Sequence, residues 1–335
     1  MDRSIIRRRD FLALGLAVAS TPSTANAALF SRRKKFPDKP IRLVVPFAPG
    51  SGSDFVGRLW AEHARPHLGT LVIENQTGGA GSIGGASVAH AKPDGYTLLV
   101  AATTAFILET LLKRKPLYNP VKELVPVSNL AISALVMAVN PTVPAASLKE
   151  LAAHAAANPR KVTFGSAGVG SMGHLTGEMF KSLTKTPGIT HVPYRGGNQL
   201  ITDTVGGQIS MMIAPATDQV LELHRSGKLK ILAVTSPSRL IVAPEIPTAV
   251  ESGVPGMVVF VFLGLFAPRG TPKAIVEQVS QASRAAMADP AFQKKLVDAG
   301  FRPDPESTPE KLQQYIRYDL ERWGPLIKDI GLKLD

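Results

Sequence analysis

The sequence predicts an α/β protein with mainly parallel sheets flanked by helices. Short apolar runs, each with the length of a buried strand, alternate with segments in which apolar residues recur at helical spacing. Glycine- and serine-rich loops follow several of these strand-like runs. The chain has 335 residues, of which 44% are hydrophobic, so it can form one large domain or two domains with packed cores.

The expected elements follow one another in a strand–helix rhythm. Strands are expected, in chain order, at 41–47, 71–74, 96–101, 135–139, 161–164, 209–213, 229–234 and 258–266. Helices are expected at 55–63, 148–157 and 175–183, and from Pro272 and Pro309 onward. Proline is favoured at the first position of a helix, where no amide hydrogen bond is lost. Alternation of this kind is typical of parallel strands joined by crossover helices.

The first 27 residues predict an export signal. Basic residues dominate 1–9, an apolar run covers 11–19, and Ala25-Asn26-Ala27 is a small-x-small cleavage site. The segment Arg8-Arg9-Asp10-Phe11-Leu12 matches the twin-arginine pattern, which directs a chain to the export route for folded proteins. An ordinary secretory signal with extra arginines is the alternative. No later stretch stays apolar for the length of a membrane helix.

Composition limits the classes of function. The absence of cysteine excludes disulfide scaffolds, thiolate metal sites and cysteine nucleophiles. The formal charge of +12 is compatible with nucleic acid, an anionic surface or an anionic small ligand. Part of this charge is one basic run at 32–35, and the few aromatic residues do not interleave with basic ones. We therefore expect an anionic small ligand and no nucleic acid.

Two segments repeat the same local pattern. Residues 41–63 and 161–183 both run from a strand through a Gly/Ser loop into a helix that begins beside Ser or Asp. Such a loop directs several backbone N–H groups to one point at the positive end of the helix dipole, which forms an anion site without charged side chains. Two such loops predict two lobes that face one anion. The alternative is that they are ordinary tight turns with capped helices.

Two motifs suggest enzymes, and both are incomplete. Gly79–Gly84 is a literal GxGxxG, but the acidic residue that would bind a nucleotide ribose is missing, since the next strand ends in 101–104 without an acid and the first acid after that strand is Glu109. The stretch 169–173 approaches a nucleophile elbow, but Val169 replaces its first glycine, and His174 is too near in sequence to be the usual base. We expect no catalytic residues and no cofactor.

No metal site is expected either. His63 and His67 have the spacing of ligands on one helix face, but Arg65-Pro66 is expected to interrupt that face.

The ordered series of motifs resembles the Bug family, the periplasmic receptors of tripartite tricarboxylate transporters (TTT). The resemblance covers essentially residues 36–335, and the order and spacing of the motifs carry it. The matching segments are 40–50 with Asp54, 72–75, 78–85, 93–99, 166–168, 170–171, 174–175, 191–196, 202–203, 206–208, 232–236 and 264–268.

The resemblance implies a two-lobed periplasmic binding protein, a Venus flytrap of type II. After the signal at 1–27, the first lobe would comprise 28–131 plus 264–335, and the second 132–263. It implies a monomer in the periplasm that captures a small carboxylate between the lobes and delivers it to a TTT-type membrane permease. Di- and tricarboxylates, acidic amino acids and aromatic acids are the expected ligands. An exported enzyme on this fold, or a sensor that signals to a partner, is the alternative.

The resemblance also implies a set of ligand-binding residues, carried over by motif. They are Phe47, Gly50, Ser51, Gly52, Ser53, Asp54, Thr103, Thr104, Ser166, Ala167, Gly168, Ser171, His174, Tyr194, Arg195 and Pro215. Three have local alternatives: Asp54 as a helix cap, His174 as a structural side chain, and Arg195 as an exposed residue. The segment 214–217 departs from the family pattern, so the distal part of the pocket is expected to be atypical.

Overall fold

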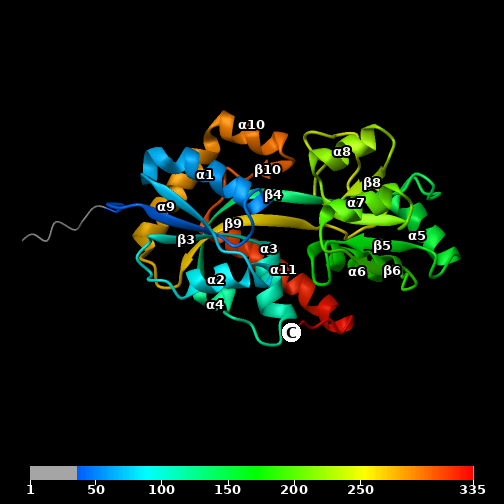
Figure 1. Cartoon of the computed structure of the whole chain (residues 1–335), viewed down its shortest axis with the longest axis horizontal. Helices are drawn as coiled ribbons and strands as arrows, with labels where there is room; N and C mark the ends of the chain where they lie inside the picture. Colours follow the sequence, from blue (N-terminus) through cyan, green and yellow to red (C-terminus); the bar gives the residue numbers. More distant parts are fainter. Residues whose placement is uncertain (1–35, 335) are drawn as a thin grey trace, which may run out of the picture. The chain divides into compact units, whose positions relative to one another are not determined.

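A computed structural model describes residues 36–334, and the chain from Lys39 onward forms one compact unit (Figure 1). The predicted signal at 1–27 and the basic run at 32–35 lie outside the described residues. In this part of the chain, no helix is both long and apolar enough to cross a membrane.

The first sheet has the strand order β2-β1-β3-β9-β4, and β10 also pairs with β4. Strands β1, β2 and β3 are parallel, as predicted, whereas β9 runs antiparallel to β3 and to β4. The bounds are β1 Ile41–Val45, β2 Leu71–Asn75, β3 Thr97–Ala102, β4 Leu124–Val139, β9 Phe260–Pro268 and β10 Phe301–Pro303.

The second sheet uses the other half of β4. There β4 pairs antiparallel with β7 and β8, while β5 lies parallel to β6 and β7. The bounds are β5 Thr163–Ser166, β6 Thr190–Pro193, β7 Met211–Pro215 and β8 Lys230–Val234. The α/β class is thus confirmed. The sheets are mixed, since the predicted parallel strands are joined by the antiparallel strands β4 and β9.

Helices cover both faces of each sheet. Figure 1 shows α1, α9 and α10 on one side of the first sheet and α2, α4 and α11 on the other. The bounds are α1 Gly52–Leu68, α2 Ser82–Ala89, α3 Thr103–Ile107, α4 Pro120–Glu123, α5 Leu148–Ala157, α6 Met172–Thr184, α7 Gly197–Val205, α8 Asp218–Arg225, α9 Lys273–Ala288, α10 Pro290–Asp298 and α11 Pro309–Asp329, with a 3-10 turn at Gly79–Gly81 and a π-turn at Leu108–Leu112.

The C-terminal helix α11 packs against two hydrophobic cores. Its first half places Leu312 and Ile316 among the residues that cover the first sheet. Its second half places Trp323 and Ile327 in the core that β4, β5 and α6 share. Burial of these large side chains is favourable by about 1.5–3 kcal/mol each, so α11 fastens the two halves of the chain to each other.

The glycine-rich stretch after β2 serves close packing. Gly79–Gly81 forms the 3-10 turn, and Ser82–Gly84 begins α2. A Cβ atom added to Gly85 would lie 2.2 Å from the Tyr118 hydroxyl. Glu109 is fully buried and forms an ion pair with Lys113 at 2.8 Å. Its carboxylate therefore has its partners within the protein and stabilises the fold.

One prediction about α1 is wrong. The helix continues through Pro66 to Leu68, so Arg65-Pro66 does not interrupt it. Proline this close to the end removes only one backbone hydrogen bond, and the helix stops two residues later. His63 binds Asp289 through Nδ1 at 2.8 Å, and residues 36–334 contain no cluster of three or more metal-binding side chains.

Candidate functional site

The first candidate loop joins β1 to α1. Ser51 is the N-cap of α1, and its hydroxyl oxygen accepts a hydrogen bond from the Asp54 amide at 3.3 Å. The Asp54 carboxylate accepts hydrogen bonds from the Gly50 amide (2.9 Å), from Arg58 (2.9 Å) and from the side-chain amide of Asn75 (2.8 Å). Asp54 therefore holds the loop together from within, while Ser51 and not Asp54 is the N-cap of α1.

These hydrogen bonds determine which backbone N–H groups of the first loop remain free to bind a ligand. Asp54 is only 3% exposed. Burial opposes its ionisation, but the hydrogen bonds from Arg58, Asn75 and Gly50 outweigh burial and lower the pKa of its carboxyl below the usual value. The ionised side chain accepts the hydrogen bond of the Gly50 amide, so this amide is not free to bind a ligand. Among the described residues, the amides of Gly52 and Ser53 have no hydrogen-bond partner.

The second candidate loop, between β5 and α6, repeats this bonding pattern. Ser171 is the N-cap of α6, and its hydroxyl oxygen accepts from the His174 amide at 3.2 Å. The Gly170 amide donates to Nδ1 of His174 at 3.1 Å, as the Gly50 amide does to Asp54. Both loops thus share the motif Gly-Ser-x-x-Asp/His. In the described chain, the amides of the first two α6 residues, 172 and 173, are also unpartnered.

The Ser171 hydroxyl is linked to a second serine and a histidine. Ser171 donates to Ser166 Oγ at 3.2 Å, and Ser166 Oγ lies 2.8 Å from His191 Nε2. His191 stacks on His174 with ring centroids 4.0 Å apart, and Phe164 stacks on His191 at 4.8 Å. His191 is not among the ligand-binding residues that the sequence predicts. Its position in the motif 191–196 is the sequence feature that could have indicated a role.

Both histidines are held in the neutral form. Burial lowers the pKa of His191 to about 4, with the neighbouring His174 and Lys181 adding to this effect. Burial also lowers the pKa of His174, against the opposing charge of Glu178. His174 is 7% exposed, and its Nδ1 is used by Gly170, so its imidazole is not placed to act as a base for Ser171. In this structure His174 bonds within its own loop and packs on His191.

The remaining predicted residues differ in their surroundings. Thr103 is fully buried and accepts from the Phe262 amide at 3.0 Å, so it fastens α3 to β9. Tyr194 is 9% exposed and donates to Asp203 at 2.9 Å; burial, followed by this bond, raises its pKa to about 12. Arg195 is exposed, as its local alternative predicts. The other candidates are half-buried or exposed at loop and element ends: Phe47, Thr104, Ala167, Gly168 and Pro215.

Each loop is therefore assembled around its own helix start. Among residues 36–334, no hydrogen bond, ion pair or ring contact joins 47–54 to 166–174. The second loop instead touches hydrophobic side chains from distant segments, since a Cβ on Gly170 would lie 2.8 Å from Leu334 and 3.2 Å from Leu112.

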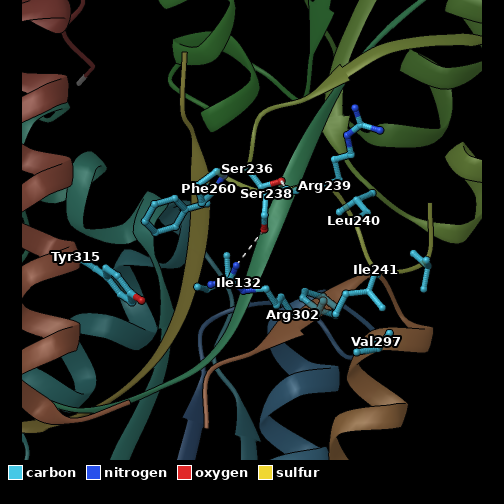
Figure 2. Close-up of a pocket in the computed structure, with 15 residues that line it drawn as sticks. Ile132, Ser236, Ser238, Arg239, Leu240, Ile241, Phe260, Val297, Arg302 and Tyr315 are labelled. Atoms are coloured by element: carbon cyan, nitrogen blue, oxygen red, sulfur yellow. Dashed lines mark hydrogen bonds between the residues drawn. The ribbon is translucent and has the colours of Figure 1, made fainter. Parts of the chain in front are cut away.

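A cavity of about 120 Å³ lies beside β4 and β9 (Figure 2). None of the sixteen candidate residues lines it. It borders the first loop through Phe301, whose ring stacks on Phe55 at 6.1 Å. The lining residues are Ile132, Ala134, 236–242, Phe260, Val297, Gly300, Phe301, Arg302 and Tyr315. Sequence patterns do not indicate this cavity, because five separate segments line it: 132–134, 236–242, Phe260, 297–302 and Tyr315.

Comparison with known proteins identifies the relatives. Residues 56–332 match the model of TctC, the tripartite tricarboxylate transporter family receptor. BugT from Bordetella pertussis is 32% identical over 317 residues, which cover 93% of this chain and 95% of BugT. Two solved structures are 30% identical. MatC from Rhodopseudomonas palustris with bound malate has a TM-score of 0.72, covering 87% of this chain and 100% of MatC. An R. palustris protein with adipate has a TM-score of 0.75, and the match covers 89% of this chain and 99% of that protein.

Proposed function

This chain belongs to the TctC family of tripartite tricarboxylate transporter receptors, and from that premise we propose that it captures a small carboxylate between two lobes for a membrane permease. The family is one of periplasmic solute-binding receptors with a two-lobed α/β fold, so the enzyme alternative is set aside. Adipate and malate accompany the two solved relatives, and di- or tricarboxylates are accordingly the first ligands to consider.

The paired loops carry this proposal. Both begin a helix with the same Gly-Ser-x-x-Asp/His bonding, and both leave the two amides at the start of the helix unpartnered within the described chain. Backbone N–H groups at a helix start bind an anion through charge-assisted hydrogen bonds and the helix dipole. In α/β folds, ligands bind beyond the carboxyl ends of the strands, where both loops lie.

The proposal extends to lobe boundaries, closure and export. The first lobe comprises 28–131 plus 264–335 and the second 132–263, with β4 and β9 as the connections that bend. The open form binds the solute through one loop and the closed form through both, so extra contacts in the closed form drive closure. The signal at 1–27 directs the chain to the periplasm through the twin-arginine route, and a TTT-type permease is the partner.

A thermal-shift screen tests the ligand class. The purified protein is heated with carboxylic acids, including adipate and malate, and with neutral sugars, cationic amino acids and nucleotides. A carboxylate at 100 times its Kd stabilises the native state by about 2.7 kcal/mol, which raises the Tm by several degrees. The amide or ester of each hit serves as the matched control and is expected to bind far more weakly. Stabilisation by a sugar or a cation alone would overturn the ligand class.

Small-angle scattering on any hit tests closure separately. We expect a smaller radius of gyration with ligand than without it. Binding without compaction would leave the carboxylate proposal standing and defeat the closure proposal.

A further inference from the structure

The cavity beside β4 and β9 combines apolar walls with two guanidinium groups, those of Arg239 and Arg302. Ile132 and Ala134 of β4 and Phe260 of β9 form one wall. Leu240 and Ile241 belong to the loop after β8, and in Figure 2 Ile241 and Val297 are drawn on the side away from Phe260. Ile241 is 65% exposed, so the apolar lining reaches the surface.

The polar groups of the cavity differ in their partners. Arg239 is neutralised by Glu251 at 3.0 Å, and the Tyr315 hydroxyl donates to Asp304 at 3.3 Å. Arg302 donates through Nη1 to the Ser238 hydroxyl at 3.2 Å, and in residues 36–334 it has no carboxylate within ion-pair distance. Arg302 is therefore a cation at an apolar cavity without a protein counter-ion.

We propose that this cavity binds a small organic monocarboxylate with an apolar body, the carboxylate on Arg302 and Ser238 and the apolar part against Phe260 and Ile132. A guanidinium group is a fixed cation with a planar set of donors that matches a carboxylate. The cavity volume is several times the 10–15 Å³ or so that a single water occupies by a comparable measure. This site goes beyond the proposed function, because it shares no residue with the two loops.

The charge pattern favours this chemistry over the alternatives. A cation would meet the positive charge of Arg302, which is exposed and has no carboxylate of residues 36–334 within ion-pair distance, and a neutral apolar molecule would not use its charge. A dicarboxylate would place its second charge among Phe260, Ile132 and Ala134, where burial of an unpaired charge is costly. One charge at one end of an apolar molecule is the arrangement that the lining accommodates.

Isothermal titration with hexanoate tests the proposal, with hexanamide as the uncharged control ligand. We expect Arg302→Gln to weaken hexanoate binding at least tenfold and Arg317→Gln, which removes an exposed arginine elsewhere on the surface, to leave it unchanged. Hexanamide is expected to bind at least tenfold more weakly than hexanoate. Equal binding of hexanoate by the Arg302→Gln variant and the unaltered protein, or equal binding of hexanamide and hexanoate, would overturn the proposal.

Two further variants test the location. Ala134→Leu fills the cavity from β4, and Val297→Phe narrows it from the rim. The test of the location needs only one of the two variants to fold. Hexanoate binding is expected to disappear in either, whereas full retention would contradict the location.

Arg302→Gln is expected to leave the Tm shifts of the carboxylate screen unchanged. A joint loss of hexanoate binding and of those shifts would mean one shared site and would overturn the claim of a second one. Failure of the screen alone would overturn only the proposed function.

Discussion

Asp54 and His174 occupy equivalent positions in the two loops, four residues after the glycine whose amide each accepts. Their chemistry differs, because Asp54 is ionised and balanced by Arg58, whereas His174 is neutral. The Asp54 carboxylate is bound by Gly50, Arg58 and Asn75, whereas His174 uses Nδ1 for Gly170 and its Nε2 lies 3.9 Å from Glu178, beyond hydrogen-bond distance. Their effect on a solute is indirect: they fix the loop backbone so that the amides at the helix start share one direction.

Ser171→Ala tests a residue proposed to contact the solute directly. The Ser171 hydroxyl donates to Ser166 in this structure and is expected to turn to the solute carboxylate on binding. The change then removes one charge-assisted hydrogen bond, worth about 1.5–3 kcal/mol, so affinity for a carboxylate is expected to fall about 10- to 150-fold. Loss of the cap costs about 1 kcal/mol of stability. Calorimetry measures the affinity and chemical denaturation the stability.

Ser147→Ala is the matched control, since Ser147 caps α5 by the same bond, to the Glu150 amide at 3.1 Å. It is expected to lose similar stability and no affinity. Unchanged affinity in Ser171→Ala would remove Ser171 from the binding site.

Asp54→Asn tests the internal support of the first loop. The variant loses the charge that Arg58 and the Gly50 amide bind, so the free energy of unfolding at pH 7 is expected to fall by about 1–3 kcal/mol. Because the pKa of Asp54 is lowered in the folded state, its stabilising effect is present above the ordinary pKa and is lost as the pH falls through the folded value.

The difference between Asp54→Asn and the unaltered protein should therefore shrink below about pH 4, as denaturation at several pH values can measure. Asp218→Asn, at an exposed first-turn position of α8, is the control. A difference that persists undiminished to low pH would contradict the ionised network.

At the scale of elements, the strand–loop–helix unit around β5 rests on aromatic rings. Phe164 of β5, His191 of β6 and His174 of α6 form one stack, and His191 also binds Ser166 at the end of β5. The stack joins two neighbouring strands to the helix that follows. The position of the second loop consequently depends on the histidines remaining uncharged.

His191→Gln tests this dependence on pH. The folded pKa of about 4 lies below the ordinary histidine value, so the unfolded chain binds more protons between about pH 6.5 and 4. Stability is thus complete above about pH 6.5 and decreases as the pH falls toward 4. Glutamine cannot be protonated there but can still bind Ser166. We expect the Tm of His191→Gln to fall less between pH 7 and 4.5 than that of the unaltered protein.

His67→Gln, which replaces an exposed histidine of α1, is the control for that comparison and should follow the unaltered protein. Identical pH profiles for His191→Gln and the unaltered protein would exclude the stack as a pH-sensitive support.

At the scale of the whole molecule, β4 and α11 connect groups of residues that are distant in sequence. Strand β4 contributes its first half to one sheet and its second half to the other. Helix α11 contributes to two cores, and Leu334 pairs with residues 112–114 by backbone hydrogen bonds. Lobe movement would therefore have to involve bending of β4 and β9 together with sliding at α11.

The proposed export route also concerns the whole chain, because the twin-arginine pathway accepts folded proteins. Replacing Arg8 and Arg9 with lysine is expected to trap the precursor in the cytoplasm, as fractionation and immunoblotting can measure. Replacing Arg32 and Arg33 with lysine is the matched control and should not affect export. Undiminished periplasmic protein from the Arg8/Arg9 variant would leave export by the ordinary secretory route as the explanation.

The sequence by itself determined the α/β class, the parallel strands of both halves and the two capped loops. These features depend on local chemistry: apolar runs, helical spacing, and Ser, Gly and Asp at helix starts. The Gly-Ser-x-x-Asp/His equivalence is visible in the sequence at 50–54 and 170–174 once the bonding is known. The family resemblance rested likewise on the order of short motifs along the chain.

Only the tertiary structure decided the rest, because it depends on contacts between distant segments. Strand β4 begins at Leu124, eleven residues before the predicted run, since pairing with β9 extends a segment that contains Pro126 and polar residues. His191 has a partner only because the fold brings Ser166 to it. Position 85 requires glycine because the fold places the Tyr118 hydroxyl where a Cβ atom would lie. The cavity at Arg302 exists only where β4, β9, β10 and the loop after β8 meet, and no local pattern in any of these segments specifies that meeting.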